Sequence, residues 1–130
     1  MMTDGVAQDG VVAQDETQIR SLWSLREGFT EALGKEPAVY KYDISMPVPK
    51  IYECVEDMRQ HLRDGGVFGQ DDSPVTDVVA YGHVGDGNLH LNIAAKRLDP
   101  KTASLIEPYL FEWVCKYQNG MGCRCEIHRR

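Results

Sequence analysis

The residues best suited to chemistry are two histidines on either side of a glycine-rich turn. They lie in the run Tyr81-Gly82-His83-Val84-Gly85-Asp86-Gly87-Asn88-Leu89-His90-Leu91-Asn92. Asp-Gly between alternating residues is a strong hairpin signal, so we expect paired strands over 75–84 and 88–95. With Asp86 and Gly87 at the centre of the turn, His83 faces His90, and we expect a four-residue loop to keep this register.

Alternation along the two strands predicts one polar and one apolar face. The polar face holds Tyr81, His83, His90 and Asn92, and the apolar face holds Ala80, Val84, Leu89, Leu91 and Ile93. Directly opposed histidines are close enough for two imidazoles to converge on one metal ion. The alternative is that both are ordinary, half-exposed strand residues.

Two histidines are too few for a tight metal site, so a further ligand must come from elsewhere. Asp86 sits at the turn tip and points away, whereas Glu126 and His128 near the C-terminus are available. Cys123 and Cys125 with His128 superficially resemble a zinc cluster. A C-x-C pair in a segment without a helix or strand pattern is more often incidental.

The composition indicates one soluble globular domain that binds a small molecule. The chain has 130 residues, of which 42% are apolar and 26% charged. A net charge of −6 and a pI near 5.1 argue against nucleic acid as a partner, and no window is apolar enough to span a membrane. Without a signal peptide, the four cysteines are expected to be free thiols, and location cannot be read directly.

The remaining elements must position the hairpin. Apolar spacing predicts helices over 15–34 and 47–63, the second capped by Ser45, with a strand over 38–44 between them. Segment 64–74 has a loop composition, and Asp99-Pro100 begins a third helix that Pro108 should kink.

This order predicts an α+β fold in which helices pack on one face of a small antiparallel sheet, ferredoxin-like but incomplete with three strands. The predicted domains are a disordered N-terminus over 1–14, a substrate and metal domain over 15–118, and a divergent tail over 119–130.

The hairpin run resembles the G-H-x-G-D-G-N-x-H signature of the C-terminal domain of FAD-linked oxidases. Two upstream words, over 22–33 and 39–45, are similar to the D-2-hydroxyglutarate dehydrogenases within that family. The resemblance implies that His83 and His90 bind a divalent, zinc-like metal. It further implies that Arg26, Thr30, Lys41 and Asn92 hold the hydroxyacid.

The residue types agree with these implied roles. Arg26 and Thr30 are four apart on one helical face, and arginine can grip a carboxylate through two hydrogen bonds. Lys41 adds a second positive charge suited to a dicarboxylate. Taken singly, each of these residues is more often a solvated surface residue, so the joint match carries the interpretation.

The resemblance also implies a mechanism in which a metal binds the 2-hydroxyl, a base removes its proton, and hydride passes from C2 to FAD. The family's FAD domain and its Glu-His-Gly word, which supplies a third ligand and the base, are not found here. Neither Glu126 nor His128 takes that place, so no catalytic residue is assigned.

We therefore expect a fragment of a flavin-dependent dehydrogenase of D-2-hydroxyglutarate or a similar D-2-hydroxyacid, inactive alone and mitochondrial by resemblance. An FAD-domain partner chain is one expected partner, besides the hydroxyacid. The alternatives are a non-catalytic module that binds a divalent metal or a dicarboxylate, and an unstable product without function.

Overall fold

The computed structural model describes residues 9–117 and 126–129, which belong to two compact units, Met1–Lys35 and Glu36–Arg130. The first unit contains helix α1 (Glu16–Leu33), whose predicted extent is confirmed. Asp15 caps its start by accepting a hydrogen bond from the Gln18 backbone, and the Gly34 backbone N–H bonds the Thr30 and Glu31 carbonyls at its end. The predicted domain limits at 14 and 118 remain predictions.

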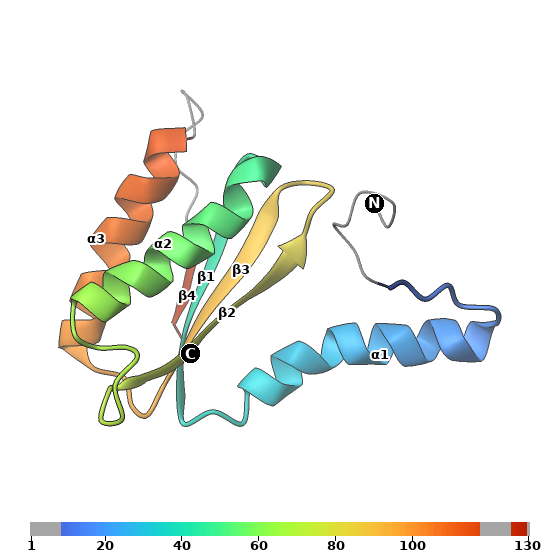
Figure 1. Cartoon of the computed structure of the whole chain (residues 1–130), viewed down its shortest axis with the longest axis horizontal. Coiled ribbons are helices and arrows are strands. Elements are labelled where there is room, and N and C mark those ends of the chain that lie inside the picture. The colour runs from blue at the N-terminus through green and yellow to red at the C-terminus, as the bar shows by residue number, and fades with distance from the viewer. Residues whose placement is uncertain (1–8, 118–125, 130) are drawn as a thin grey trace. The chain divides into compact units, whose positions relative to one another are not determined.

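The second unit is a sheet with helices on one face (Figure 1). Its elements are β1 (Ala38–Ser45), η1 (Val48–Lys50), α2 (Ile51–Asp64), β2 (Val75–His83), β3 (Asn88–Ala95), α3 (Pro100–Tyr117) and β4 (Glu126–Arg129). The strands lie in the order β2-β3-β1-β4, and every neighbouring pair is antiparallel. The predicted α+β class is confirmed, and the β-α-β-β-α-β order is that of the ferredoxin-like fold.

The sheet has one strand more than the three that were predicted. β4 pairs along β1 over Tyr40–Asp43 and makes a fourth strand, so the sheet is less incomplete than expected. At four residues it is too short for alternation to reveal, and the sequence around it carries no strand pattern.

Burial follows the alternation of the strands and the spacing of the helices. The inner face of the sheet and the inner faces of α2 and α3 enclose one apolar core. Its most deeply buried side chains are Ile44, Met58, Leu62, Val78, Leu91, Ile93, Ile106, Leu110 and Val114. β1 and β3 are the inner strands of the sheet, so side chains on them are held by partners on both sides.

The connection between β1 and α2 differs from the prediction. Ser45 is the last residue of β1, opposite Asn88, and does not cap a helix. A 3₁₀ turn follows, closed by the Lys50 N–H to the Pro47 carbonyl at 2.8 Å, and α2 begins only at Ile51. Pro47 and Pro49 lack backbone donors, which favours this tight turn over regular helix.

The start of α3 is fixed from β1. Asp99 caps the helix by accepting hydrogen bonds from the Thr102 hydroxyl at 3.0 Å and backbone N–H at 3.1 Å, and this lowers the pKa of its carboxyl group. The Tyr40 hydroxyl accepts from the Asp99 N–H at 2.6 Å and donates to the Asp99 carbonyl at 3.0 Å. Pro108 lies inside α3. The predicted kink there remains a prediction.

Polar contacts join α2 to α3 above the core. The indole N–H of Trp113 donates to Asp57 at 2.8 Å, and the His61 ring stacks on Tyr109 at 3.8 Å.

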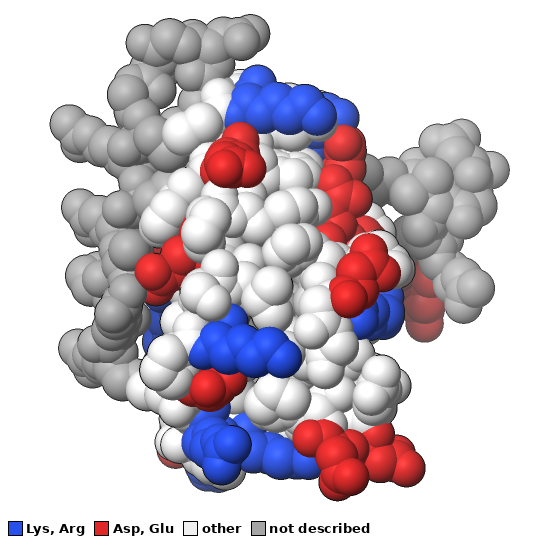
Figure 2. Space-filling view, turned by 90° about the vertical axis from the view of Figure 1, so that its left-hand side faces the viewer, with Lys and Arg blue, Asp and Glu red and all other residues white. Residues whose placement is uncertain are grey.

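Viewed from the α3 side, white side chains cover the middle of the surface and basic and acidic side chains are interspersed around them (Figure 2). Among the described residues seen from this side, the two signs of charge are mixed.

Candidate metal and hydroxyacid site

The hairpin that carries both histidines pairs in a different register from the predicted one. The four residues 84–87 join β2 to β3, and His83 lies opposite Asn88. Tyr81 lies opposite His90, so the two histidines are diagonal neighbours. The predicted pairing of His83 with His90 is wrong because β2 already ends at His83. Val84 joins the loop, where it is 68% exposed, so its place on the apolar face was also wrong.

The polar side chains nevertheless share one face of the sheet. The observed register is displaced from the predicted one by two residues, and side chains alternate with a period of two. Such a shift changes the partners without changing the faces. Tyr81, His83, His90 and Asn92 therefore lie together, opposite the buried Leu89, Leu91 and Ile93.

Two glycines of the hairpin are required by its geometry. A Cβ on Gly82 would lie 2.1 Å from the Asn88 carbonyl oxygen, so only glycine allows this approach beside His83. Gly87 has a φ of 69°, and its carbonyl accepts a hydrogen bond from the Met46 N–H at 3.0 Å. Asp86 accepts from the Asn88 N–H at 3.1 Å, and its side chain thus stabilises the turn.

The two imidazoles are close enough to share one ion. Their ring centroids are 5.5 Å apart, with the planes nearly perpendicular. Two imidazoles on one tetrahedral ion, at ~2.0 to 2.1 Å per nitrogen, place their ring centres roughly 5 Å apart. The separation of the rings is therefore compatible with both imidazoles on one divalent ion, and the metal site stays a prediction.

Asp43, which was not predicted from the sequence, contacts one of the two histidines. It lies opposite His90 on the neighbouring strand β1, and its carboxylate accepts a hydrogen bond from the His90 ring nitrogen Nδ1. Both side chains are about one-third exposed. Finding Asp43 required knowing that β1 lies beside β3 and in which register. Alternation within 38–45 already placed Lys41 and Asp43 on one face.

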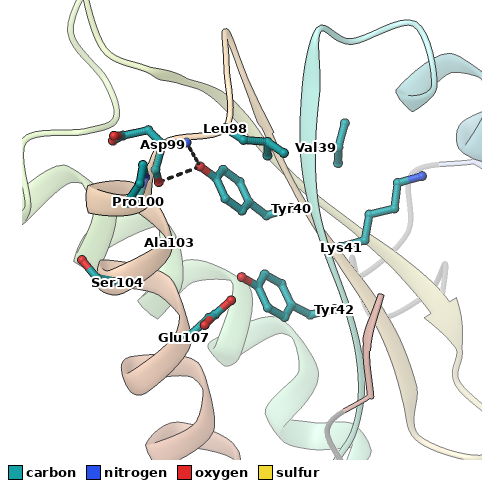
Figure 3. Close-up of a pocket in the computed structure, with 10 residues that line it drawn as sticks. All are labelled: Val39, Tyr40, Lys41, Tyr42, Leu98, Asp99, Pro100, Ala103, Ser104 and Glu107. Atoms are coloured by element: carbon teal, nitrogen blue, oxygen red, sulfur yellow. Dashed lines mark hydrogen bonds between the residues drawn. The ribbon is translucent and has the colours of Figure 1, made fainter. Parts of the chain in front are cut away.

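Lys41 and Asn92 lie opposite each other on β1 and β3, next to the Asp43 and His90 pair. Asn92 is only 2% exposed, and its side-chain amide donates to the His90 carbonyl at 3.0 Å. Figure 3 shows Lys41 extending from β1 on the side away from Tyr40 and Tyr42. Of the four predicted substrate residues, the sheet brings these two to the histidines.

Arg26 and Thr30 lie four positions apart on α1, in the first unit. The prediction that they point toward the same site as the histidines stays a prediction.

The C-terminal candidates are only partly within the described residues. Glu126 and His128 belong to β4, where they pair with Asp43 and Lys41. Cys123 and Cys125 lie outside the described residues, so the zinc-cluster alternative remains a prediction. Within the described part of the chain, no group of three or more His, Cys, Asp or Glu side chains could hold a metal ion. Cys54 and Cys115 are free thiols, as predicted.

A separate cavity of about 480 Å³ lies between β1 and the first turns of α3 (Figure 3). Tyr40 and Tyr42 line it from the strand, and Ala103, Ser104 and Glu107 line it from the helix. Val39 and Lys41, which extend from the other side of β1, also line it.

The chain belongs to the family described as FAD linked oxidases, C-terminal domain, whose model matches residues 1–122. It is 50% identical over 122 residues to the mitochondrial D-2-hydroxyglutarate dehydrogenase of Danio rerio. It is 49% identical over 118 residues to the Arabidopsis thaliana enzyme of the same name. A putative mitochondrial D-lactate dehydrogenase of Schizosaccharomyces pombe is 45% identical over 119 residues.

These matches cover 94%, 91% and 90% of this chain but only 21%, 19% and 23% of the relatives. The chain thus spans about a fifth of the length of these proteins. The hairpin therefore belongs to a domain of this family, and FAD is the cofactor that the family implies. No helix in the described residues is long and apolar enough to cross a membrane.

Proposed function

We propose that this chain supplies the metal and hydroxyacid site of a flavin-dependent dehydrogenase that oxidises D-2-hydroxyglutarate, or a similar D-2-hydroxyacid, to the 2-oxoacid. The observation that carries the proposal is the hairpin over 82–90, which brings the imidazoles of His83 and His90 to 5.5 Å on one polar face. The names of several relatives support the substrate and the mitochondrial location.

The donor set agrees with a zinc-like ion at this face. His83 and His90 would hold it, since imidazole nitrogen suits the later divalent transition metals better than magnesium or calcium. Bound there, such an ion supplies Lewis acidity that makes a hydroxyl proton easier to remove. At least one further ligand would have to come from residues other than these two histidines.

The charge on the same face agrees with a carboxylate substrate. Lys41 lies two residues from Asp43 on β1, on the same face of the sheet as the histidines, and would offer a positive charge to one carboxylate. Arg26 and Thr30 would hold a second carboxylate, as the dicarboxylate 2-hydroxyglutarate requires. Asn92 would position the substrate from β3. FAD, which the flavin-binding part of the enzyme or a partner chain would hold, would supply the hydride acceptor for oxidation at C2.

Calorimetry on the zinc-loaded chain tests the substrate. D-2-hydroxyglutarate should bind at least about tenfold more tightly than D-lactate, because the second carboxylate adds a charge-assisted hydrogen bond. Arg26→Ala should remove much of this preference, while Lys101→Ala, at the exposed start of α3, should leave it intact. Equal binding of D- and L-2-hydroxyglutarate, or equal effects of the two variants, would contradict the proposed site.

Flavin content distinguishes the enzyme from a non-catalytic metal or dicarboxylate module. The native assembly isolated through this chain should carry yellow FAD with the flavin absorbance bands. A colourless assembly that binds zinc and dicarboxylate would support the module instead.

A further inference from the structure

The contact between Asp43 and His90 fixes which nitrogen of the imidazole carries the proton. An ionised carboxylate can only accept hydrogen bonds, so Nδ1 of His90 must donate to Asp43. In the neutral imidazole the remaining nitrogen, Nε2, then has no proton and keeps its lone pair. His90 is thereby set in the form that can bind an ion or accept a proton through Nε2.

The surroundings of Asp43 hold it in place for this contact. β1 lies between β3 and β4, so backbone pairing restrains Asp43 from both sides. Ile44 beside it is 1% exposed and Tyr42 is 4% exposed, which anchors the strand in the core and directs Asp43 to the opposite face. The His90 backbone is held as well, because its carbonyl accepts from the buried Asn92 amide.

The two histidines are therefore unequal. The described residues give His83 a ring contact with His90, but no hydrogen bond or ion pair of its side chain. It lies at the end of β2, an edge strand, so the backbone there pairs with β3 on one side only. Of the two rings, that of His90 is therefore the one oriented by a hydrogen bond.

We infer that Asp43 is the positioning residue of this site, holding His90 in the Nδ1–H tautomer so that Nε2 faces the metal and the substrate. The inference rests on the proposed function for the identity of the ion, but the tautomer exists without any ion. Carboxylates that orient metal-binding histidines raise metal affinity by factors of ~10 to 100. Asp43 acts through His90 and is not itself a ligand.

Nitrogen NMR of histidine-labelled, metal-free chain tests the tautomer. At about pH 8.5, roughly two units above the ordinary imidazole pKa, neutral His90 should be mainly Nδ1–H. A hydrogen bond to a charged group favours that form by roughly tenfold or more. In Asp43→Ala the Nε2–H form should dominate, and Asp43→Asn should give a mixture. Ser45→Ala, on the same strand and face, should not change the ratio.

Zinc titration of the same four proteins tests the consequence. Asp43→Ala should weaken zinc binding by about 10- to 100-fold, Asp43→Asn by less, and Ser45→Ala by less than about twofold. In the zinc-loaded wild-type chain, the metal-induced shift should fall on Nε2 of His90. Backbone NMR spectra establish that each variant is folded, and Asp43→Asn provides the readout if Asp43→Ala does not fold.

Three results would overturn the inference: an unchanged His90 tautomer in folded Asp43→Ala, a zinc-induced shift on Nδ1, or unchanged zinc affinity in both Asp43 variants. A wild-type chain that shows the Nδ1–H tautomer but binds no zinc would support the effect of Asp43 on the His90 tautomer. That same result would contradict the proposed metal site, so the two failures are distinguishable.

Discussion

Adjacent residues of strand β3 point to opposite faces of the sheet, where one set packs in the core and the other lies in the candidate site. Leu89, Leu91 and Ile93 are at most 3% exposed and pack against the helices. His90, one residue away from Leu91, is about one-third exposed and contacts Asp43 and His83 on the other face. The apolar face therefore supplies the free energy that holds the strand, and the polar face is positioned by it without contributing much stability.

This difference explains why the predicted face of the histidines is correct although the predicted strand register is wrong. Burial selects the face on which a residue lies, and the displacement by two residues preserved that face. Changes on the apolar side should thus affect folding, while changes on the polar side should affect binding.

The largest effect should follow truncation of the apolar face. Leu91→Ala removes a fully buried side chain and should lower the free energy of unfolding by about 2 to 5 kcal/mol, because a cavity remains. His90→Ala should lower it by no more than about 1 kcal/mol, since its pair with Asp43 is partly exposed. Urea unfolding of both variants measures the contrast. Equal losses would mean that the polar face is part of the core.

Binding should show the opposite contrast. The chain should bind zinc weakly, and His83→Ala/His90→Ala should reduce the affinity by at least about 100-fold. Magnesium and calcium should bind less well than zinc. His61→Gln, in the α2–α3 contact, is the matched control and should leave zinc binding unchanged.

Two calorimetric outcomes would contradict this prediction. Equally tight binding in the double variant would move the site to Cys123, Cys125 and His128. Sub-nanomolar binding that the double variant loses would require another ligand within the chain.

Two glycines of the hairpin should differ in how well they tolerate a side chain. Gly82→Ala should cost about 1 to 3 kcal/mol and displace His83, because the new Cβ meets the Asn88 carbonyl. Gly85→Ala should cost less than about 0.5 kcal/mol, since a Cβ at that position would meet nothing within 4 Å. Thermal unfolding with zinc titration measures both, and equal costs would show that the turn, not the close approach, limits the hairpin.

The sequence predicted the elements of this fold and the face of its site better than their pairing. Helical spacing located α1 and α3, and alternation separated His90 from Leu91. The register depended on where β2 ends. Alternation over 75–84 cannot distinguish a last strand residue from a first loop residue.

What the sequence left out was information on contacts between distant segments. The partner of His90 comes from residue 43, and the fourth strand pairs with β1 from the far end of the chain. Neither contact leaves a pattern in the nearby sequence, because both depend on hydrogen bonding between strands that are distant along the chain. Two prolines likewise replaced the expected helix start at Ser45 with a 3₁₀ turn.

The smallest expected effect is a pH dependence of the stability that comes from a buried thiol on the apolar side. Cys54 of α2 is 1% exposed, and burial, with a smaller contribution from Asp57, raises the pKa of its thiol from 9.0 to about 12. Between about pH 9 and pH 12 the folded chain therefore binds more protons at this thiol than the unfolded chain does. Stability from Cys54 is fully present below pH 9.0 and is lost as the pH rises through that window.

The wild-type chain should accordingly lose about 1 kcal/mol more than Cys54→Ala between roughly pH 9 and pH 10. The cavity in the variant lowers its stability at every pH, and the other titrating groups are common to both proteins, so the pH-dependent difference isolates the thiol. Urea unfolding at matched pH measures it, in a Cys123→Ser/Cys125→Ser background that leaves Cys115 as the exposed thiol of the described residues. Parallel pH profiles for the two chains would mean that Cys54 is not held in the apolar layer that positions the histidine face.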